Sequence, residues 1–345
     1  MQQLVSILIP AYNAEKWIQE TLRSAVNQTW PRKEIILVDD GSSDHTLAIA
    51  HQFDTPLLKV IAQENRGASA ARNRALAHAQ GDHIQWLDAD DLLAPDKIEQ
   101  QMKEAGRGKD SMTLLSSPQG TFYWRWEKAR FAPHALWQDL TPIEYLLAYF
   151  SENIWFSPAA WLVSRRLTEQ AGPWDERLSL NDDGEYFCRV VAKCEHITFV
   201  PTARCYYRRS GFSQLSRATG NRAAASLLLS LTLSIGHLRS LEDSARTRSA
   251  ALIAVQESLS SFRPEQTDLR EMIDRLAFDL GGRLRPPQHG WKVELLQALF
   301  GKQQGMAALH LLRKMKLTTA IRWDELLYRI SRTPGACRKG ICNHR

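Results

Sequence analysis

The sequence is poor in cysteine and lacks an apolar run long enough to cross a bilayer. Of its five cysteines, only Cys337 and Cys342, with His344 nearby, approach the spacing of zinc ligands, and a fourth ligand is missing. We therefore expect reduced thiols rather than disulfides or a zinc site. The most apolar stretch, residues 223–238, is laced with serine and threonine and is shorter than the ~20 residues of a membrane-spanning helix. Residues 4–9 have no basic leader of a secretory signal, so we expect a cytoplasmic protein.

Four apolar runs in the N-terminal third each end in a polar cluster. The runs are predicted strands at residues 4–9, 34–38, 57–62 and 83–87, and the clusters are residues 10–13, 39–42, 64–67 and 88–90. Predicted helices separate them: one capped by Asn13 with Trp17, Ile18, Leu22, Ala25 and Val26 on its apolar face, and two at 46–53 and 68–79. This alternation predicts parallel strands with right-handed crossovers, buried on both faces. All four clusters then lie at the carboxyl edge of the sheet, where such sheets bind ligands.

The fourth cluster, Asp88-Ala89-Asp90, places two carboxylates close together. In an extended segment, residues two apart point to the same side, and two such carboxylates need a cation beside them. Mg²⁺ satisfies this need by joining one or two carboxylates to phosphate oxygens. The alternative is a solvated turn, because Asp-x-Asp also occurs by chance.

Together these clusters resemble the nucleotide-sugar half of family 2 glycosyltransferases with the GT-A fold, an α/β fold with a mostly parallel sheet. The resemblance is close over residues 4–105 and looser to residue 216. The motifs that carry it are Pro10-Ala11-Tyr12-Asn13, Asp39-Asp40-Gly41-Ser42-Ser43-Asp44, Asn65-Arg66-Gly67 with Ala71-Arg72-Asn73, and Asp88-Ala89-Asp90-Asp91.

The resemblance implies a donor site for a nucleotide sugar, with UDP as the expected nucleotide. Its residues would be Pro10, Ala11, Tyr12 and Asn13 at the base and ribose, Asp39 or Asp40 at the uracil imide, Asn65, Arg66, Gly67 and Arg72 near the pyrophosphate, Asp88 and Ala89 at the ribose or sugar, and Asp90 on Mg²⁺ or Mn²⁺. Of the two uracil candidates we favour Asp39. The alternatives are a turn at Asp39-Asp40, with Gly41 at positive φ, and a helix cap with a surface arginine at residues 65–67.

The resemblance also implies a general base in the acceptor half. Asp182-Asp183 stands where the family usually has Glu-Asp before an amphipathic helix, so Asp183 would take the proton of the acceptor hydroxyl in a single inverting displacement. The alternative is a run of acids that complements the helix dipole. Trp174 and Asp182 are weaker acceptor or diphosphate candidates. Where many relatives have a histidine in the closing loop, this chain has Arg209-Ser210, so Arg208 or Arg209 would neutralise the diphosphate instead.

The middle segment, which belongs to the acceptor half, contains further predicted elements and many aromatic residues. Thr141 to Glu144 form a capping box that opens a helix, 159–163 is a predicted strand, and 172–177 is a predicted loop. Residues 121–161 are unusually aromatic, which suits sugar rings as well as core packing. We expect the acceptor to bind near this segment.

We divide the chain into a catalytic domain, 1–216, with nucleotide-sugar (1–105) and acceptor (106–216) halves, and a helical region, 217–345.

The last 45 residues hold ten Lys or Arg and two acids, a net charge of +8, so the other 300 residues carry −2 of the total +6. Their apolar positions have helical spacing, as in a helix that lies on a membrane surface. A lipid-linked saccharide acceptor at the inner membrane surface would fit this tail. The alternatives are a packing helix pair or an oligomer contact, and nucleic-acid binding ranks low.

The leading hypothesis is thus an inverting, metal-dependent glycosyltransferase acting on a saccharide or lipid-linked saccharide. A catalytically silent nucleotide-sugar-binding scaffold is the alternative, although the joint presence of Asp39, Asp90 and Asp183 argues against it. A nucleotidyltransferase would need a glycine-rich, lysine-containing loop in place of residues 10–13. A polymerase is disfavoured by the single Asp-x-Asp site.

Overall fold

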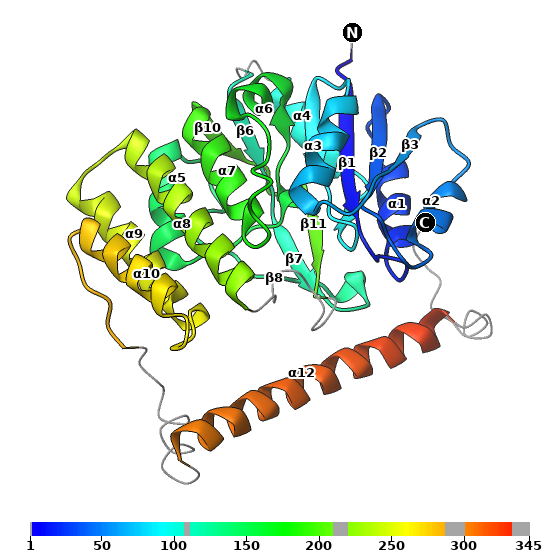
Figure 1. Cartoon of the computed structure of the whole chain (residues 1–345). Helices are drawn as coiled ribbons and strands as arrows, with labels where there is room; N and C mark the ends of the chain where they lie inside the picture. Colours follow the sequence, from blue (N-terminus) through cyan, green and yellow to red (C-terminus); the bar gives the residue numbers. More distant parts are fainter. Residues whose placement is uncertain (1, 107–110, 210–219, 287–300, 333–345) are drawn as a thin grey trace.

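The computed structural model describes residues 2–106, 111–209, 220–286 and 301–332. Its central sheet has the strand order β3-β2-β1-β4-β9. The strands are β1 (Val5–Ala11), β2 (Lys33–Asp39), β3 (Leu58–Ala62), β4 (His83–Trp86) and β9 (Val163–Ser164). The first four are parallel, and β9 runs antiparallel to β4. The predicted parallel sheet is therefore confirmed, and β1 to β4 end at one edge (Figure 1).

Three helices connect the four parallel strands as the alternation predicted: α1 (Ile18–Val26), α2 (Thr46–His51) and α3 (Ala68–His78). After β4 come the short β5 (Leu92–Leu93) and a further helix, α4 (Lys97–Ala105), which was not predicted. The predicted cap of α1 is wrong. Asn13 instead has a left-handed backbone (φ 49°), and its side-chain Oδ1 accepts a hydrogen bond from Ser43 N at 2.8 Å. It thus ties the end of β1 to the turn after β2.

The middle of the chain adds two smaller sheets and three helices. One sheet has the order β5-β11-β7-β8 and the other pairs β10 with β6. The new elements are β6 (Thr113–Ser116), β7 (Gln119–Phe122), η1 (Trp126–Lys128), β8 (Arg130–Phe131), α5 (Pro142–Glu152), η2 (Pro158–Ala160), α6 (Arg165–Ala171), α7 (Asp182–Lys193), β10 (His196–Phe199) and β11 (Cys205–Arg208). The capping box at Thr141 and the loop after Gly172 are confirmed. The strand predicted at 159–163 is wrong in its first part, because Pro158 starts a 3-10 turn; Leu162 forms a bridge with Leu115, and Val163 pairs with Ile84.

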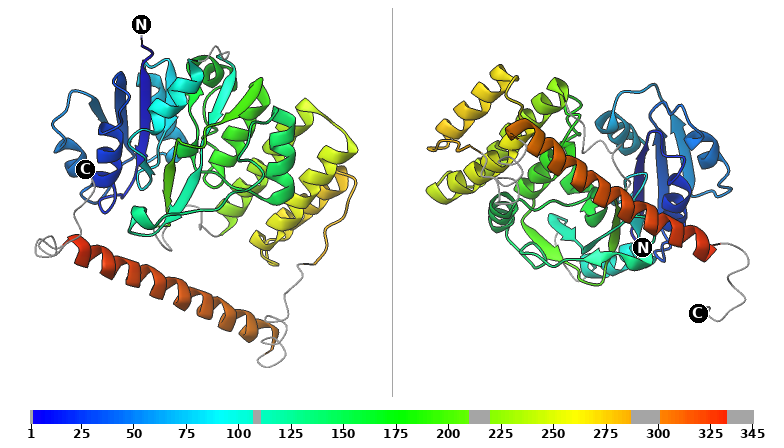
Figure 2. Two further views of the ribbon diagram at one scale, coloured as in Figure 1. Left: turned by 180° about the vertical axis from the view of Figure 1, so that it is seen from behind. Right: turned by 90° about the horizontal axis from the view of Figure 1, so that it is seen from below.

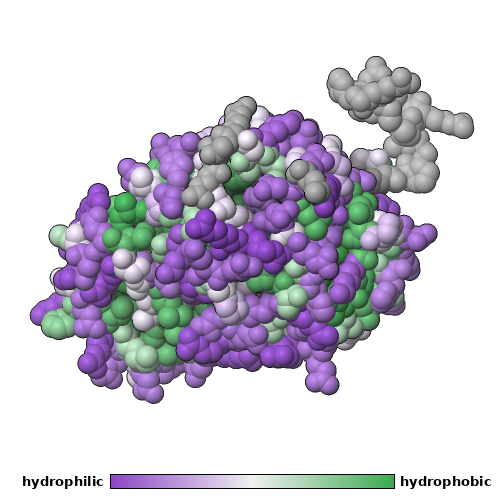
Figure 3. Space-filling model, turned by 90° about the horizontal axis from the view of Figure 1, so that it is seen from above, coloured by the Kyte–Doolittle hydropathy of each residue, from purple (hydrophilic) through white to green (hydrophobic). Residues whose placement is uncertain are grey.

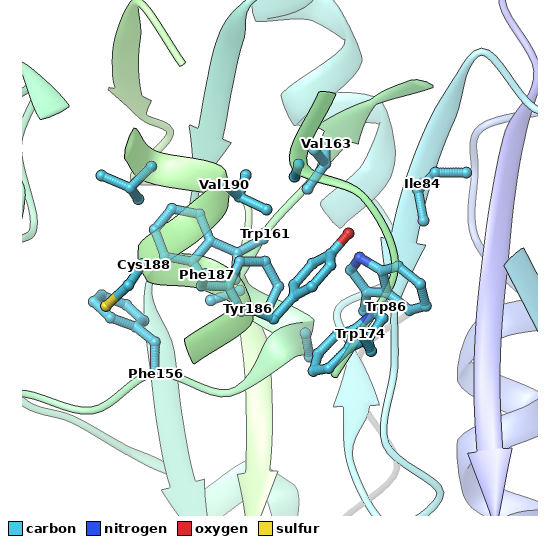
Figure 4. Packing of buried hydrophobic residues seen from close by; sticks show 14 of the residues in the cluster. Ile84, Trp86, Phe156, Trp161, Val163, Trp174, Tyr186, Phe187, Cys188 and Val190 are labelled. Carbon is cyan, nitrogen blue, oxygen red and sulfur yellow. The ribbon is translucent and has the colours of Figure 1, made fainter. Parts of the chain in front are cut away.

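An aromatic cluster joins α7 to the central sheet (Figure 4). Trp174 stacks on Tyr186 at 4.0 Å between ring centroids, and Trp86 at the end of β4 packs edge-on against both. Trp161 stacks on Phe187 at 5.2 Å in the same core. The start of α7, where Asp182 and Asp183 lie, is therefore fixed by rigid packing next to the carboxyl end of β4.

The C-terminal region is helical, as predicted, with α8 (Asn221–Leu241), α9 (Ala245–Ser258), η4 (Leu259–Ser261), α10 (Thr267–Asp279) and the long α12 (Lys302–Arg332). At 21 residues, α8 is longer than expected and has the length and composition of a membrane-spanning helix. Four of its buried residues, Ala224, Leu228, Ile235 and Leu238, nevertheless belong to the same core as α5 and α7. The boundary drawn at 216/217 falls within residues 210–219, outside the described residues, and the division stays a prediction.

Helix α12 lies apart from the other C-terminal helices. It crosses the side of the molecule toward which β1 and β2 run (Figures 1 and 2). Its inner side contacts the body: Asp324 accepts hydrogen bonds from Trp124 N at 2.9 Å and Arg125 Nε at 2.7 Å, and Tyr328 donates to Glu20. The opposite side of the molecule is largely hydrophilic with separate apolar patches (Figure 3).

Candidate active site

The nucleotide end of the site lies where β1 and β2 finish. Ala11 pairs with Asp39 in register, and Tyr12 follows with half of its surface exposed. Asp39 is buried; its Oδ2 accepts from Ser42 N at 3.1 Å, whereas its Oδ1 has no hydrogen-bond partner in the described part of the chain. A buried carboxylate oxygen without a donor is costly, so this atom is suited to receive one from a ligand.

Asp40 has a structural role. Its Oδ1 accepts from Gln63 Nε2 at 2.7 Å and Arg66 N at 2.9 Å, and its Oδ2 accepts from Gly67 N at 2.8 Å. These bonds fix the loop before α3, where Gly67 takes φ 94°. Between the two candidates for the uracil contact, the geometry therefore favours Asp39.

The Asp-x-Asp segment is a turn, closed by Asp91 N donating to Asp88 O at 3.1 Å. The expectation that Asp88 and Asp90 share one side of an extended segment is therefore wrong; the turn instead places both carboxylates near Asp91. Asp88 and Asp90 are half-buried, whereas Asp91 is fully buried and accepts from Ser157 Oγ at 2.6 Å and Arg208 N at 2.9 Å. Burial, with the nearby Asp90 and Asp88 carboxylates, raises the pKa of Asp91 well above its ordinary value.

Arg208 supports this turn from behind. It is fully buried, donating through Nε to Asp90 O at 2.8 Å and through Nη2 to Glu20 Oε2 at 2.8 Å, and it lies over the Trp17 ring at 4.4 Å. The hypothesis that Arg208 contacts the diphosphate does not agree with this burial. Arg209 is exposed and stays a candidate.

Arg72 joins the two acidic motifs. Its Nη2 donates to Asp88 Oδ1 at 2.8 Å and its Nη1 to Asp182 Oδ2 at 2.6 Å, while its guanidinium lies over the Trp174 ring at 4.3 Å. Trp174 is buried beneath it, which argues against the predicted contact of Trp174 with the acceptor. Arg72 is committed to carboxylates, whereas Arg66 is exposed and pairs with Glu176 at 2.9 Å. Of the two arginines proposed for the pyrophosphate, Arg66 is the more accessible.

Asp183 lies in the first turn of α7, half-buried and next in sequence to Asp182, the partner of Arg72. Its Oδ1 accepts from Gly184 N at 2.9 Å, and its Oδ2 accepts from the indole N–H of Trp155 at 3.3 Å. Burial and then the neighbouring Asp182 carboxylate raise the pKa of Asp183 to about 7, against the opposing effect of Arg72. A carboxyl group with such a pKa is suited to proton transfer near neutral pH.

The sequence did not single out Trp155, although it belongs to the aromatic segment. It is 39% exposed, and its ring packs edge-on against Tyr207 at 4.4 Å. A small cavity next to it is lined by Tyr145, Tyr149, Asp183 and other residues. An exposed indole hydrogen-bonded to the candidate base is a suitable platform for a sugar ring.

Serines of α8 hold the segment that leads into Asp183, a role that no local sequence pattern indicates. Ser226 Oγ accepts from Ser179 N at 2.8 Å and Leu180 N at 2.9 Å, and Ser230 Oγ accepts from Asn181 Nδ2 at 2.8 Å. Asn181 has a left-handed backbone (φ 57°), and its Oδ1 lies 2.5 Å from where a Cβ on Gly184 would stand. The start of α7 therefore depends on α8 and on glycine at position 184.

The acidic turn fits a divalent ion held mainly by a diphosphate. Within the described ranges, no group of three or more His, Cys, Asp or Glu could hold a metal alone. Mg²⁺ and Mn²⁺ do not need such a group when one or two carboxylates and phosphate oxygens complete the shell. Asp90, half-buried at this turn, is the carboxylate that would hold the cation.

Residues 6–172 match the family described as glycosyl transferase family 2. Among curated proteins, a putative teichuronic acid biosynthesis glycosyltransferase, TuaG of Bacillus subtilis, is 43% identical over 103 residues, 29% of this chain and 41% of its own. The Escherichia coli UDP-Glc:alpha-D-GlcNAc-diphosphoundecaprenol beta-1,3-glucosyltransferase WfgD is 40% identical over 100 residues, 29% of this chain and 40% of its own. These matches thus cover well under two thirds of the relatives' lengths.

Solved structures show the same fold. The structure of S. aureus TarS 1-349 in complex with UDP-GlcNAc superposes with a TM-score of 0.66 at 18% identity, covering 80% of this chain and 81% of that one. At this identity the likeness establishes the fold, which is the GT-A fold that the motifs predicted.

Proposed function

We propose that this chain, which contains a family 2 glycosyltransferase domain over residues 6–172, transfers a sugar from a UDP-sugar to a hydroxyl group of a saccharide or lipid-linked saccharide. The observation that carries the proposal is the clamp of Arg72 on Asp88 and Asp182. It brings the acidic turn of the donor half and the acidic start of α7 to one place, as transfer between two bound substrates requires.

In the proposed reaction, Asp39 Oδ1 accepts the imide N–H of uracil, and Tyr12 lies against the base or ribose. Asp90 would hold Mg²⁺ or Mn²⁺, which supplies Lewis-acid stabilisation of the departing diphosphate. Asp183 takes the proton from the acceptor hydroxyl as its oxygen attacks the anomeric carbon and the bond to the diphosphate breaks. One base and one displacement give inversion at that carbon. Trp155 holds the acceptor ring and orients the Asp183 carboxylate.

The acceptor and location belong to the same proposal. A lipid-linked saccharide acceptor has support from WfgD, whose name specifies such an acceptor. We accordingly propose a cytoplasmic protein that works at the inner membrane surface. A silent nucleotide-sugar-binding scaffold is the competing function, but a raised pKa on a half-buried carboxyl beside an exposed tryptophan favours catalysis.

A nucleotide panel tests the donor assignment. UDP, GDP, dTDP and CMP are added with and without Mn²⁺, and the thermal midpoint is measured, since a ligand that binds only the native state stabilises it. We expect UDP with Mn²⁺ to give the largest shift.

Asp39→Ala should weaken UDP binding roughly tenfold or more, since a charge-assisted hydrogen bond is lost. Asp90→Ala should remove the Mn²⁺-dependent part of the shift.

The matched control for this panel is Glu64→Ala, which removes an exposed carboxylate from the neighbouring loop and should leave the UDP shift unchanged. A larger shift with another nucleotide would contradict the uracil assignment. If none of the nucleotides shifts the midpoint, the donor site itself is wrong.

Trp155→Phe keeps an aromatic ring but removes the N–H that stabilises ionised Asp183. Losing a hydrogen bond to the charged form raises the pKa of the carboxyl group, so the acid limb of the pH–rate profile should move upward by roughly half a unit to one unit. The readout is release of UDP from the UDP-sugar that binds. Trp126→Phe, whose ring packs on Tyr206, serves as the control. An unmoved acid limb would rule out this role for the indole.

A further inference from the structure

Helix α12 presents a stripe of large apolar side chains to solvent. They are Leu311 (58% exposed), Met315 (57%), Trp323 (60%), Leu326 (48%) and Ile330 (54%). At 100° per residue these five positions fall within about a third of the helix circumference. Exposed large apolar residues gathered on one helix face are unusual in a soluble protein and indicate a surface that is covered in use.

The opposite face of α12 is already occupied by the body of the protein. Asp324 binds Trp124 N and Arg125, the Tyr328 ring packs on Trp124 at 5.5 Å between centroids, and the Tyr328 hydroxyl donates to Glu20. The apolar stripe therefore points away from the body. The contacts that hold α12 on the body leave the stripe free to bind a partner.

The charge of α12 selects among partners. Its sequence contains seven Lys or Arg and two acids. Both acids are neutralised by arginines within the chain, Asp324 by Arg125 at 2.7 Å and Glu325 by Arg329 at 2.6 Å. A second copy of so basic a helix would be repelled, whereas a surface of anionic headgroups would be attracted.

We propose that the outward face of α12 is a docking surface for an anionic lipid bilayer. The apolar side chains enter the boundary between headgroups and acyl chains, and the flanking basic residues contact the headgroups, as in helices that lie in the membrane plane. The sequence predicted that the basic tail contacts a membrane surface. The proposal assigns this contact to one face of α12, which also defines how the protein is oriented on the bilayer.

The orientation has a consequence for the active site. Because α12 crosses the side toward which β1 and β2 run, a bilayer on its outer face would lie at the carboxyl edge of the sheet (Figures 1 and 2). The inner face is linked to the acidic turn through Glu20 and Arg208, which bonds to Asp90 O. A lipid-linked acceptor would then reach Asp183 from the membrane; this last step rests on the proposed function, whereas lipid docking itself does not.

The test is co-sedimentation of the full chain with vesicles of phosphatidylglycerol or of phosphatidylcholine alone. The stripe variant, Trp323→Ser with Leu326→Ser and Ile330→Ser, removes three of the five side chains of the stripe. The matched control, Met272→Ser with Phe278→Ser, removes two similarly exposed apolar residues from α10. We expect binding to phosphatidylglycerol vesicles, weakened by salt, that falls about tenfold or more in the stripe variant and is unchanged in the control.

Three results would overturn the proposal: equal binding to both kinds of vesicle, equal loss in both variants, or retention of binding in the stripe variant. Self-association of the free chain that the stripe variant abolishes would assign the face to a second copy instead. The thermal midpoint of the stripe variant without ligand verifies its fold, and the single change Trp323→Ser replaces it if that midpoint falls well below that of the wild type. Vesicle binding needs no nucleotide, so its failure is distinct from failure of the proposed transfer.

Discussion

Asp183→Asn should remove sugar transfer while leaving UDP binding intact. The amide cannot take a proton from the acceptor hydroxyl, and loss of a positioned general base typically costs about 10²- to 10⁴-fold in rate. The substitution is nearly isosteric, and the amide oxygen of the new side chain can still accept the bond from Gly184 N that Asp183 accepts at 2.9 Å. The measurement pairs the thermal shift with UDP and Mn²⁺ with the rate of UDP release from the donor.

The same change should stabilise the fold at higher pH. Because the folded-state pKa of Asp183 is raised from 3.8 to about 7, its stabilising contribution is full below pH 3.8 and is lost as pH rises through about 7. Asparagine has no charge to bury, so the midpoint of Asp183→Asn relative to that of the wild type should rise between about pH 4 and pH 7 and stay constant above that range. A variant that is inactive and more stable carries the mark of a functional group held at a cost in stability.

Asp182→Asn is the matched control for this prediction. Asp182 is adjacent on α7 and accepts from Arg72 and from Ser69 Oγ at 3.2 Å, so its loss should affect packing more than proton transfer. It also removes a carboxylate that raises the pKa of Asp183, and the acid limb of the pH–rate profile should move downward. Normal transfer by Asp183→Asn would show that the base assignment is wrong.

The sequence was a sufficient guide to the parallel sheet and to the edge where the motifs meet. Alternating apolar runs and helical stretches are local patterns, and right-handed crossovers leave few topologies to choose from. The register of Ala11 with Asp39 then follows from where the strands end. The strand predicted at 159–163 overlaps β9 only at Val163, because the pairing of β9 with β4 that sets its bounds is a long-range contact, which no local pattern records.

Residue roles within the site depended on contacts that the sequence does not contain. Arg72 and Arg66 looked equivalent, but Asp88 and Asp182, 16 and 110 positions away from Arg72, bind it from two sides. The sequence favoured Asp39 over Asp40 without a contact to decide between them, and the structure shows that backbone amides of the loop before α3 bind both carboxylate oxygens of Asp40. Such assignments require three-dimensional neighbours, because side-chain partners lie far apart along the chain.

Arg72→Ala should cost more than any other single change at this site. The guanidinium is buried and neutralises Asp88 and Asp182. Removing one partner of a fully buried pair costs roughly 3–5 kcal/mol, and because these two carboxylates are only partly buried we expect a loss toward the lower end of that range. The variant should unfold at a lower temperature and lose UDP binding, since Asp88 belongs to the donor turn. Loss of the cation should also raise the pKa of Asp183 further, because Arg72 opposes the shift caused by burial.

Arg66→Ala distinguishes this clamp from a general effect of removing positive charge. Arg66 lies in the loop that precedes α3, the helix that carries Arg72, but its pair with Glu176 is exposed, and exposed pairs contribute little to stability. We expect a small change in midpoint for Arg66→Ala and a large one for Arg72→Ala.

The difference in thermal midpoint between Arg72→Ala and the wild type should narrow as pH falls, because protonation relieves the repulsion among the unpaired carboxylates. Arg72→Lys should recover only part of the loss, since one ammonium group does not reproduce the two-sided geometry of the guanidinium fork. Equal effects of the two alanine variants would mean that the two acidic motifs are held together by the aromatic core beneath Trp174 and that the clamp is incidental to it.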